Sequence, residues 1–339
     1  MEPGAPPVWA TLSVASCNLL NLARAHRVFY ENQPPFTADE QDRKVDWLAT
    51  MFARLDADLF GVQEVWDLSV LHEVLGRSRL RGHRAVAPGA EDTGGARGAE
   101  GTPRVGLVSR LPIEELRSVI DFGAGEAVEV QELGTHARFE RPVLHAVLRA
   151  KFAPRLHVIV VHLKSKRPKF LQDAAGNPTE DRDDPKVTAR AMLRSLVMRG
   201  AEAAALRGLV LDLLHRTHEP LVLIGDFNDA PASVTSQLVA ATSTVAYDRG
   251  ARDAALWHAW DVQTDATIRR DVAYSHVYQG HPELLDQIWV SEEFVAGSRH
   301  AIGDVKRVEV FNDHLNEGRE RIRSDHGFVR ALLRMRGGD

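Results

Sequence analysis

The sequence predicts an α/β fold in which sheets are buried under helices. Short apolar runs alternate with segments of helical periodicity, and further strand-like runs lie between them. The chain has 339 residues, of which 44% are hydrophobic and 26% charged, as in ordinary soluble globular proteins. Two stacked sheets with flanking helices can use this whole length. We therefore expect a single domain over residues 1–339.

The first clear helix is expected over residues 37–55. Thr37 and Glu40 have the spacing of a capping box. The apolar residues that follow recur at helical spacing and form one stripe: Val45, Leu48, Met51, Phe52 and Leu55. The segment "ADLFGVQE" then predicts a short strand that ends at Glu64.

Two further helices follow from the same kind of pattern. Residues 68–76 predict a helix that Gly76 ends. The longest helix is expected over about 186–217, with Gly200 and Gly208 as weak points.

Irregular segments are expected in two places. Residues 87–104 are rich in Gly and Ala, which predicts a flexible loop between strands, because strand-like "VGLVSRLPI" resumes at once. The acidic stretch 171–185 is expected at the surface. The last run, "GFVRALLRM", predicts a closing strand.

Charge and cysteine content exclude some classes of protein. The formal net charge is −5 and the pI is near 6.3, which disfavours a binder that grips nucleic acid by bulk charge, although a local basic patch stays possible. Cys17 is the only cysteine, so no intramolecular disulfide can form, and we expect a buried, inert thiol.

The ends of the chain show no membrane signal. The N-terminal segment has no basic region, and no apolar run reaches about 18 residues. We therefore expect no signal peptide and no membrane span, which favours a cytoplasmic location; removal of a signal peptide would leave a secreted protein with the same pattern.

Polar and ionisable residues stand at the ends of the predicted strands. They are Asn18, Glu64, His162, Asp226, Asn228, Asp286, Asp325 and His326. Strands that finish in this way can point their polar groups at one edge of a sheet. Asp226 and Asn228 are two residues apart, so they would share a side if the extended path continued.

These residue types suit a magnesium site. A hard cation prefers oxygen ligands, chiefly one or two carboxylates. Glu64 and Asp325 supply carboxylates and Asn18 supplies a neutral oxygen. A thiolate pair and an HExxH motif are both absent from the sequence, which disfavours a structural or protease-type zinc site. Histidines beside a metal and spare carboxylates fit phosphoryl chemistry.

In chain order, "CN", "QE", "VHLKSK", "GDFND", "LDQIWVS" and "SDH" resemble the motifs of the endonuclease/exonuclease/phosphatase superfamily. That group includes pancreatic-type deoxyribonuclease, abasic-site endonucleases, neutral sphingomyelinases and inositol polyphosphate phosphatases. The resemblance covers residues 11–333. It implies a four-layered α/β/β/α sandwich of two mixed sheets flanked by helices, with the site at one edge of the sheets.

The resemblance also implies a metal and a nucleophile. Glu64 matches the principal ligand of Mg²⁺ or Mn²⁺, and Asn18 and Asp325 complete that site. Asp226 matches the residue that orients or deprotonates the attacking water. Asn228 matches a residue that binds the phosphate or a second metal.

Three further positions match residues that contact or support the phosphate. His326 matches a phosphate-contacting histidine, and Asp286 matches the carboxylate that fixes its tautomer. His162 matches a second such histidine, found in the deoxyribonuclease and sphingomyelinase branches. Abasic-site endonucleases lack that histidine and usually carry tyrosine where this chain has Gln287, so abasic-site repair is disfavoured.

The substrate is predicted from the segments beside these positions. "HLKSKRPK" supplies cations directly after His162, with Lys164 and Lys166 as candidate substrate contacts, and it resembles bacterial nucleases of the superfamily. Tyr274 and His276 could stack on a base. The leading hypothesis is therefore a metal-dependent nuclease acting on DNA or RNA. The alternatives are a phosphoesterase for a small or lipid substrate and a binding protein without catalysis; the filled catalytic positions disfavour the latter. The sequence indicates no protein partner.

Overall fold

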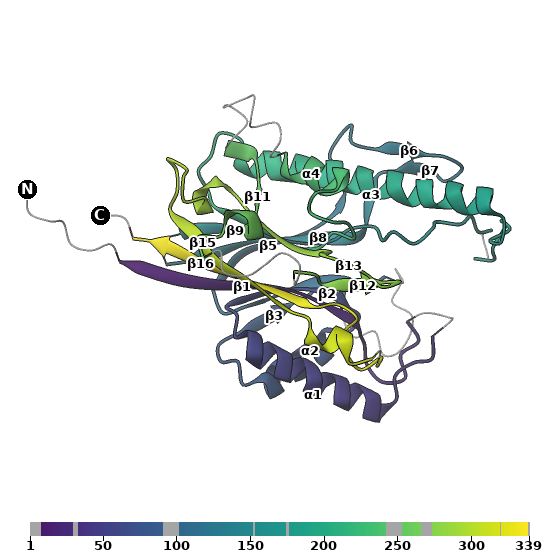
Figure 1. The fold of residues 1–339 in the computed structure, drawn as a ribbon, viewed down its shortest axis with the longest axis horizontal. Helices are drawn as coiled ribbons and strands as arrows, with labels where there is room; N and C mark the ends of the chain where they lie inside the picture. Colours follow the sequence, from purple (N-terminus) through teal and green to yellow (C-terminus); the bar gives the residue numbers. More distant parts are fainter. Residues whose placement is uncertain are drawn as a thin grey trace, which may run out of the picture.

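The structure is a computed structural model, and it describes residues 8–29, 33–90, 102–151, 153–173, 176–241, 253–265, 273–318 and 320–337. Two sheets of six strands pack face to face, and helices cover the outer face of each (Figure 1). The predicted four-layered α/β/β/α sandwich is therefore confirmed.

The first sheet is mixed. Its strands, in spatial order, are β15 (Gly303–Phe311), β16 (Phe328–Arg336), β1 (Trp9–Leu22), β2 (Leu59–Val65), β4 (Arg104–Ser109) and β3 (Arg84–Val86). β1 and β2 run parallel, and the other neighbours are antiparallel. The outer helices of this half are α1 (Ala38–Leu55) and α2 (Leu68–Ser78).

The second sheet is also mixed. Its order is β11 (Trp257–His258), β14 (Asp286–Val290), β10 (Leu221–Asp226), β9 (Ala153–His162), β8 (Arg138–Ala150) and β5 (Ile113–Asp121). β9 and β10 form its parallel pair. Its helices are α3 (Pro185–Leu214) and α4 (Val234–Ala240).

Short elements complete the described chain. Two hairpins pair β6 (Val128–Val130) with β7 (Gly134–His136), and β12 (His276–Tyr278) with β13 (His281–Glu283). The remaining helical turns are α6 (Ala259–Val262), η3 (Glu292–Phe294) and η4 (Asp313–Asn316).

Each parallel pair needs a crossover, and a long helix supplies it. α1 connects β1 to β2, and α3 connects β9 to β10. As a result the carboxyl ends of β1 and β2 meet at one edge of the first sheet, and those of β9 and β10 at one edge of the second. The β12–β13 hairpin lies near this end of the sandwich, away from the two chain termini (Figure 1).

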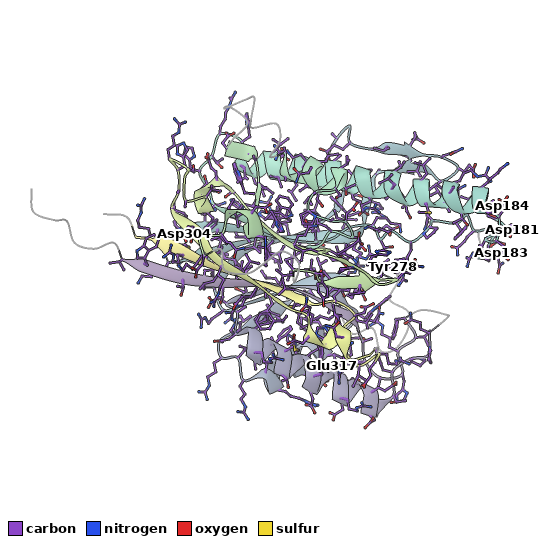
Figure 2. The ribbon with its side chains drawn as sticks, viewed as in Figure 1. Asp181, Asp183, Asp184, Tyr278, Asp304 and Glu317 are labelled. Atoms are coloured by element: carbon purple, nitrogen blue, oxygen red, sulfur yellow. The ribbon has the colours of Figure 1, made fainter. Side chains whose placement is uncertain are left out.

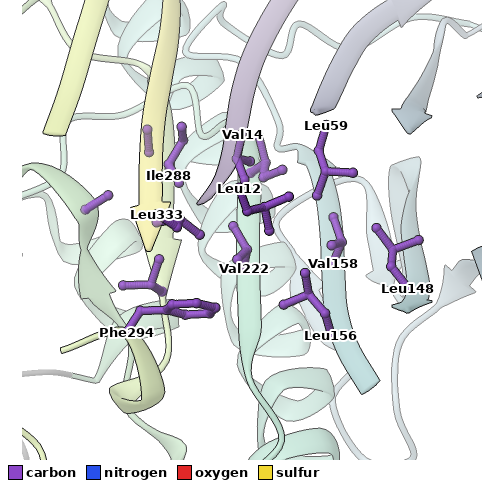
Figure 3. Packing of buried hydrophobic residues seen from close by; sticks show 14 of the residues in the cluster. Leu12, Val14, Leu59, Leu148, Leu156, Val158, Val222, Ile288, Phe294 and Leu333 are labelled. Atoms are coloured by element: carbon purple, nitrogen blue, oxygen red, sulfur yellow. The ribbon is translucent and has the colours of Figure 1, made fainter. Parts of the chain in front are cut away.

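Three apolar interfaces hold the four layers together. Between the sheets, Leu12 and Val14 of β1 pack with Val222 of β10 and Ile288 of β14 (Figure 3). A second cluster joins α1 and α2 to the first sheet, and a third joins α3 and α4 to the second. Cys17 is fully buried in the second cluster, as the sequence predicted.

The three helices predicted from the sequence are present, and the main differences concern the effect of glycines and the helix ends. α1 begins after Thr37, and the capping box with Glu40 is present. The predicted end of α2 at Gly76 is wrong, because the helix runs to Ser78 and ends at Arg79 in the left-handed conformation. A glycine inside a helix costs only about 1 kcal/mol, which the buried Val70, Leu71 and Val74 can offset.

α3 likewise continues through Gly200 and Gly208 without a break. It ends at Leu214 rather than at 217. Its N-cap is Asp184, whose side chain accepts from the Lys186 N–H. Packing of the helix against the second sheet decides its continuity more than glycine propensity does.

The predicted loops and the closing strand can be compared with the structure in part. Residues 91–101, the centre of the predicted loop 87–104, lie outside the described residues. The acidic stretch is at the surface, and Figure 2 shows Asp181, Asp183 and Asp184 beside the start of α3. β16 is the predicted closing strand. In the part of the chain that is described, no helix is both long and apolar enough to span a membrane.

Candidate active site

The two sheets bring their polar strand ends together at one edge. Asn18 and Glu64 come from the parallel strands β1 and β2, and His162 and Asp226 end the parallel strands β9 and β10. The antiparallel strand β14 begins at Asp286, directly opposite Asp226. Asp325 and His326 precede β16. Residues that are far apart in the sequence therefore form one cluster.

Asp226 lies at the centre of this cluster. Its Oδ2 accepts from Asn18 Nδ2 at 3.0 Å and is 3.4 Å from His162 Nε2 and 3.9 Å from His326 Nε2. The side chain is fully buried, and burial raises the pKa of Asp226 although His326 opposes the shift. A carboxylate with a raised pKa is a stronger base, which suits the removal of a proton from water.

His326 and Asp286 form a buried pair. His326 Nδ1 lies 2.7 Å from Asp286 Oδ2. Burial disfavours the charged ring, but the carboxylates of Asp286 and Asp226 outweigh it and raise the pKa of His326 well above its ordinary value. The ring is therefore held as a cation at neutral pH, and its Nε2 can donate to an anionic oxygen.

His162 has the opposite protonation. Burial, with the positive charges of Arg141 and His326, lowers the pKa of His162 well below its ordinary value. The ring is neutral at pH 7. Its buried Nδ1 has no hydrogen-bond partner among the described residues. A buried ring nitrogen without a partner is uncommon in folded proteins, which marks His162 as a candidate functional residue.

Glu64 is the carboxylate best suited to a cation. Its Oε2 accepts from the Asn21 N–H at 2.9 Å, and its backbone φ of 63° lies in the left-handed region. Burial and the neighbouring Asp325 carboxylate raise the pKa of Glu64. A divalent cation between two such carboxylates would relieve the repulsion that raises this pKa, so the residues present fit a metal ion.

Asn18 orients the two carboxylates. Its Nδ2 contacts Glu64 Oε1 at 3.3 Å as well as Asp226, while its Oδ1 accepts from the Leu20 N–H at 3.1 Å. The oxygen that the sequence assigned to a metal is thus occupied by the backbone in this arrangement. Asp226, Asp286 and His326 also have ligand atoms within 4.8 Å of one another.

The sequence suggested that Asn228 and Asp226 share a side of an extended strand. The structure differs, because the extended path does not continue to Asn228. β10 ends at Asp226, and the chain turns at Asn228, whose φ is 52°. The Asp226 Oδ1 accepts from the Asn228 N–H at 2.8 Å, a side-chain bond that favours a turn over a strand. The Asn228 amide donates to the Leu163 carbonyl at 2.9 Å.

The predicted cationic run is largely engaged with the protein. Lys164 is buried, with its Nζ 3.9 Å from Glu140, and burial lowers its pKa. Lys166 Nζ lies 2.7 Å from Glu283 on β13 and 3.6 Å from Asp229. The acidic neighbours of both lysines could not be recognised in the sequence, because they are remote from 164–166.

The predicted aromatic contacts divide into two kinds. The His276 ring lies 4.9 Å from the His326 ring, so it borders the polar cluster around Asp226. The hydroxyl and carbonyl of Tyr274 accept from Asn316 and Asn312, which holds this residue in the protein. Tyr278, by contrast, is 60% exposed and lies at the site edge of the sandwich (Figure 2).

Sequence reasoning missed Arg141 and Lys44. Arg141 of β8 donates to the carbonyls of His162 and Leu163, and its charge acts on Glu64 and His162. Lys44 of α1 is fully buried, and burial lowers its pKa to about 7 against the attraction of Asp325 and Glu64. Both residues lie inside regular elements, where the sequence carries no signal that they face the site.

Glu202 was missed for the same reason. This buried residue of α3 accepts from the backbone N–H groups of Glu140 and Lys164 at 2.9 and 2.7 Å. It therefore joins the main chain beside Arg141 to the main chain that follows His162.

A cavity of about 550 Å³ opens beside Asp325. Leu20, Val277 and Leu315 supply apolar walls. The charged lining consists of Glu320, Arg321, Arg323 and Asp325, and Arg323 is paired with Glu317. Its volume lies within the range of about 300–1,000 Å³ that is typical of small-molecule sites.

This fold and this cluster of carboxylates and histidines define a phosphoesterase that depends on a divalent metal ion. The chain belongs to the Endonuclease/Exonuclease/phosphatase family, whose sequence profile matches residues 15–326. The predicted family is thus confirmed. No curated protein matched the sequence.

Several solved structures share the fold. A family protein from Bacteroides thetaiotaomicron has a TM-score of 0.56 and 18% identity over 97% of both chains. The mannosyl-6-phosphatase Bt3783 of B. thetaiotaomicron VPI-5482 has a TM-score of 0.54 and 18% identity, over 95% of this chain and 99% of that one. TDP2 of D. rerio, in complex with a single-strand DNA product, has a TM-score of 0.54 and 13% identity, over 96% and 99%. At these identities the likeness shows the fold alone.

Proposed function

We propose that the protein hydrolyses a compact phosphoester, with the group esterified to phosphorus held in the cavity beside Asp325. The observation that carries this proposal is the cavity of about 550 Å³ next to the catalytic cluster. It has the size of a small-molecule site and combines apolar walls with side chains of both charges. A mannosyl-6-phosphatase shares this fold, and that likeness is compatible with a compact substrate.

Asp226 activates the water in this reaction. Its buried carboxylate takes a proton from the water as the water oxygen attacks phosphorus. The bond from phosphorus to the ester oxygen breaks, the leaving oxygen takes a proton from solvent water, and Asp226 later returns its own proton to solvent. Asn18 holds Asp226 through the 3.0 Å hydrogen bond, so the base is already oriented before substrate binds.

Two histidines of unlike charge contact the phosphoryl group. His326, kept cationic by Asp286, donates from Nε2 to an oxygen on phosphorus. The neutral His162 offers the second contact. Glu64 and Asp325, with Asn18 beside them, would hold a divalent ion, Mg²⁺ or Mn²⁺, that neutralises charge on the phosphoryl oxygens. Asn228 keeps the turn after Asp226 closed and is adjacent to the phosphate position.

Substrate comparison tests the proposal. We expect higher kcat/KM on hexose phosphates and a dye phosphodiester than on plasmid DNA or oligoribonucleotides, each with and without Mg²⁺. Leu315→Trp fills the cavity and should lower kcat/KM on compact substrates by about tenfold or more, the cost of losing roughly 1.4 kcal/mol of binding. Leu315→Met, which conserves volume, is the matched control. Preference for polynucleotides, or no effect of Leu315→Trp, contradicts the proposal.

Nucleic acid is the second candidate substrate, and one observation favours it. Tyr278 is exposed at the site edge, so a base of a nucleic-acid strand could stack on its ring. Arg167 and Lys169 follow His162 in the chain and could pair with the phosphates of that strand. On this hypothesis, charge reversal at Lys166 and Lys169 raises KM on DNA or RNA and flattens its salt dependence. Hydrolysis of a dye phosphodiester stays unchanged. The ion pair between Lys166 and Glu283 favours the compact substrate instead.

A further inference from the structure

A second cluster of metal-ligating side chains lies at the opposite end of the β10–β14 pair. β10 runs from Leu221 to the catalytic Asp226, and β14 runs antiparallel to it, with Val222 opposite Val290. His218 precedes β10, and Glu292 and His300 follow β14. The strands thus separate this cluster from the catalytic edge by their whole length.

The side chains of this cluster converge closely. His218, Glu292 and His300 have ligand atoms that all lie within 4.8 Å of one another. The two imidazole rings stack with their centroids 3.9 Å apart and their planes 14° from parallel, so the exposed His218 ring must turn before both rings can direct a nitrogen at one ion. Glu293 adds a second carboxylate, since its Oε1 is 4.0 Å from His218 Nδ1.

Both carboxylates are buried and held by hydroxyl groups. Glu292 is 3% exposed and Glu293 is 2% exposed. Ser298 Oγ donates to Glu292 Oε2, and Ser291 Oγ donates to Glu293 Oε2, each at 2.6 Å. Such outer hydrogen bonds orient the carboxylates, as they do around metal ligands in general. The two buried acids therefore face histidines from a fixed position.

His300 presents an acceptor nitrogen, as a metal ligand must. Arg299 Nε donates to His300 Nε2 at 2.8 Å, and because a guanidinium has no acceptor, that ring nitrogen carries a lone pair. A metal ion would compete with the Arg299 cation here. His218 is 60% exposed, so its side chain can move to close the distance to an ion that enters from solvent.

We propose that His218, Glu292 and His300, supported by Glu293, form a second metal site for a Zn²⁺-type ion. Two imidazoles with carboxylate oxygens match the ligands of Zn²⁺, with bonds of about 2.0–2.2 Å, better than they match the all-oxygen preference of Mg²⁺. The ion would link the connection between α3 and β10 to the connection between η3 and β15. Its role is structural, and it does not depend on the proposed substrate.

Zinc binding to the whole protein tests this site. After chelator treatment and removal of the chelator, the wild type and His218→Ala/His300→Ala are dialysed against Zn²⁺, and bound metal is counted by mass spectrometry. The double variant should bind one equivalent less. It should also lose the Zn²⁺-induced rise in Tm that binding to the folded state produces. His72→Ala, which removes an exposed histidine of α2, should change neither quantity.

Two further measurements separate this site from the catalytic one. Glu64→Gln should keep the distal Zn²⁺ equivalent, and the double variant should keep its Mg²⁺-dependent hydrolysis. Co²⁺ in place of Zn²⁺ should give visible absorption bands in Glu64→Gln that vanish when His218→Ala/His300→Ala is added. Equal metal content and an equal Tm response in the wild type and the double variant would overturn the proposal and leave the cluster as a network of ion pairs.

Discussion

The 2.7 Å contact between His326 Nδ1 and Asp286 Oδ2 joins the two sheets at the edge that carries the candidate active site. Asp286 begins β14 of the second sheet, whereas His326 stands before β16 of the first. Ser275 Oγ accepts from the Asp286 N–H at 2.9 Å and so fixes the main chain at the start of β14. The protonation of His326 is therefore set by a group from the other half of the sandwich.

Replacing that carboxylate should impair the phosphoryl contact. In Asp286→Asn the ring loses the main charge that raises the pKa of His326, and it can adopt the wrong tautomer. We expect kcat to fall by about 10²–10⁴-fold, approaching the effect of His326→Ala. Steady-state kinetics on a dye phosphodiester measure this. Asp304→Asn removes a carboxylate that pairs with Arg334 instead and should leave kcat unchanged; wild-type kcat in Asp286→Asn would remove Asp286 from the mechanism.

Turnover should require a divalent metal ion that Glu64 helps to bind, so metal removal should abolish it. Burial and Asp325 raise the pKa of Glu64, so the folded protein gains when a cation neutralises this carboxylate. Glu64→Gln keeps the size of the side chain and should lower kcat by several orders of magnitude. It should also lose any rise in Tm with millimolar Mg²⁺, which follows from binding to the folded state alone. Full activity after EDTA treatment contradicts a metal at this position.

Strand ends and the main features of the helices could be predicted from the sequence, because they depend on local patterns. The Thr37 and Glu40 capping box needs only three residues of spacing, and the apolar stripe of α1 repeats within one helix. The polar ends of β1, β2, β9 and β10 could also be recognised one strand at a time. The ordered motifs then indicated the layers.

Side-chain partners that are remote in the sequence could not be predicted. Lys166 contacts Glu283, which lies 117 residues away, and Glu202 of α3 accepts from the Lys164 N–H across 38 residues. The turn at Asn228 rests on a local bond from its N–H to Asp226 Oδ1, which won over the extended path that the sequence pattern indicated. These contacts change the charge that faces a substrate, so the substrate class was less predictable than the fold.

The pH dependence of stability should report a buried histidine pair. His145 Nε2 lies 3.0 Å from His157 Nδ1, and His157 Nε2 contacts Glu219. Burial and the His157 charge lower the pKa of His145 to about 4. Between pH 4 and 6.5 the unfolded chain therefore binds more protons at this residue than the folded protein does. As a result, His145 makes the free energy of unfolding rise with pH across this range.

Urea unfolding from pH 4 to 7 measures that slope. His145→Gln removes the titrating group and keeps hydrogen-bonding capacity, so the slope between pH 4 and 6.5 should become shallower than in the wild type. His72→Gln, at an exposed position of α2, is the control and should retain the wild-type slope. An unchanged slope in His145→Gln contradicts a neutral buried His145.

Glu202 should act as a positioning residue for the catalytic edge. It accepts from the Glu140 and Lys164 N–H groups, which adjoin Arg141 and follow His162. Glu202→Gln replaces one acceptor with a donor and leaves a buried N–H unpaired, at a cost of about 1–3 kcal/mol. A small shift of His162 follows, so kcat should fall by about tenfold or more with little change in KM, because misplacement by about 1 Å can cost 10²-fold. Asp212→Asn, on the exposed side of α3, is the matched control.

A pH series distinguishes this role of Glu202 from simple loss of stability. Burial raises the pKa of Glu202 to about 7, so the folded protein holds this proton more tightly than the unfolded chain between pH 4.5 and 7. The stabilising contribution is complete below pH 4.5 and is lost as pH rises through 7. Glu202→Gln should remove that decline in the free energy of unfolding, while the loss of kcat persists at pH 5, where both proteins are folded. Recovery of wild-type kcat at pH 5 would show that Glu202 affects only stability, because positioning by its two hydrogen bonds predicts a deficit at every pH.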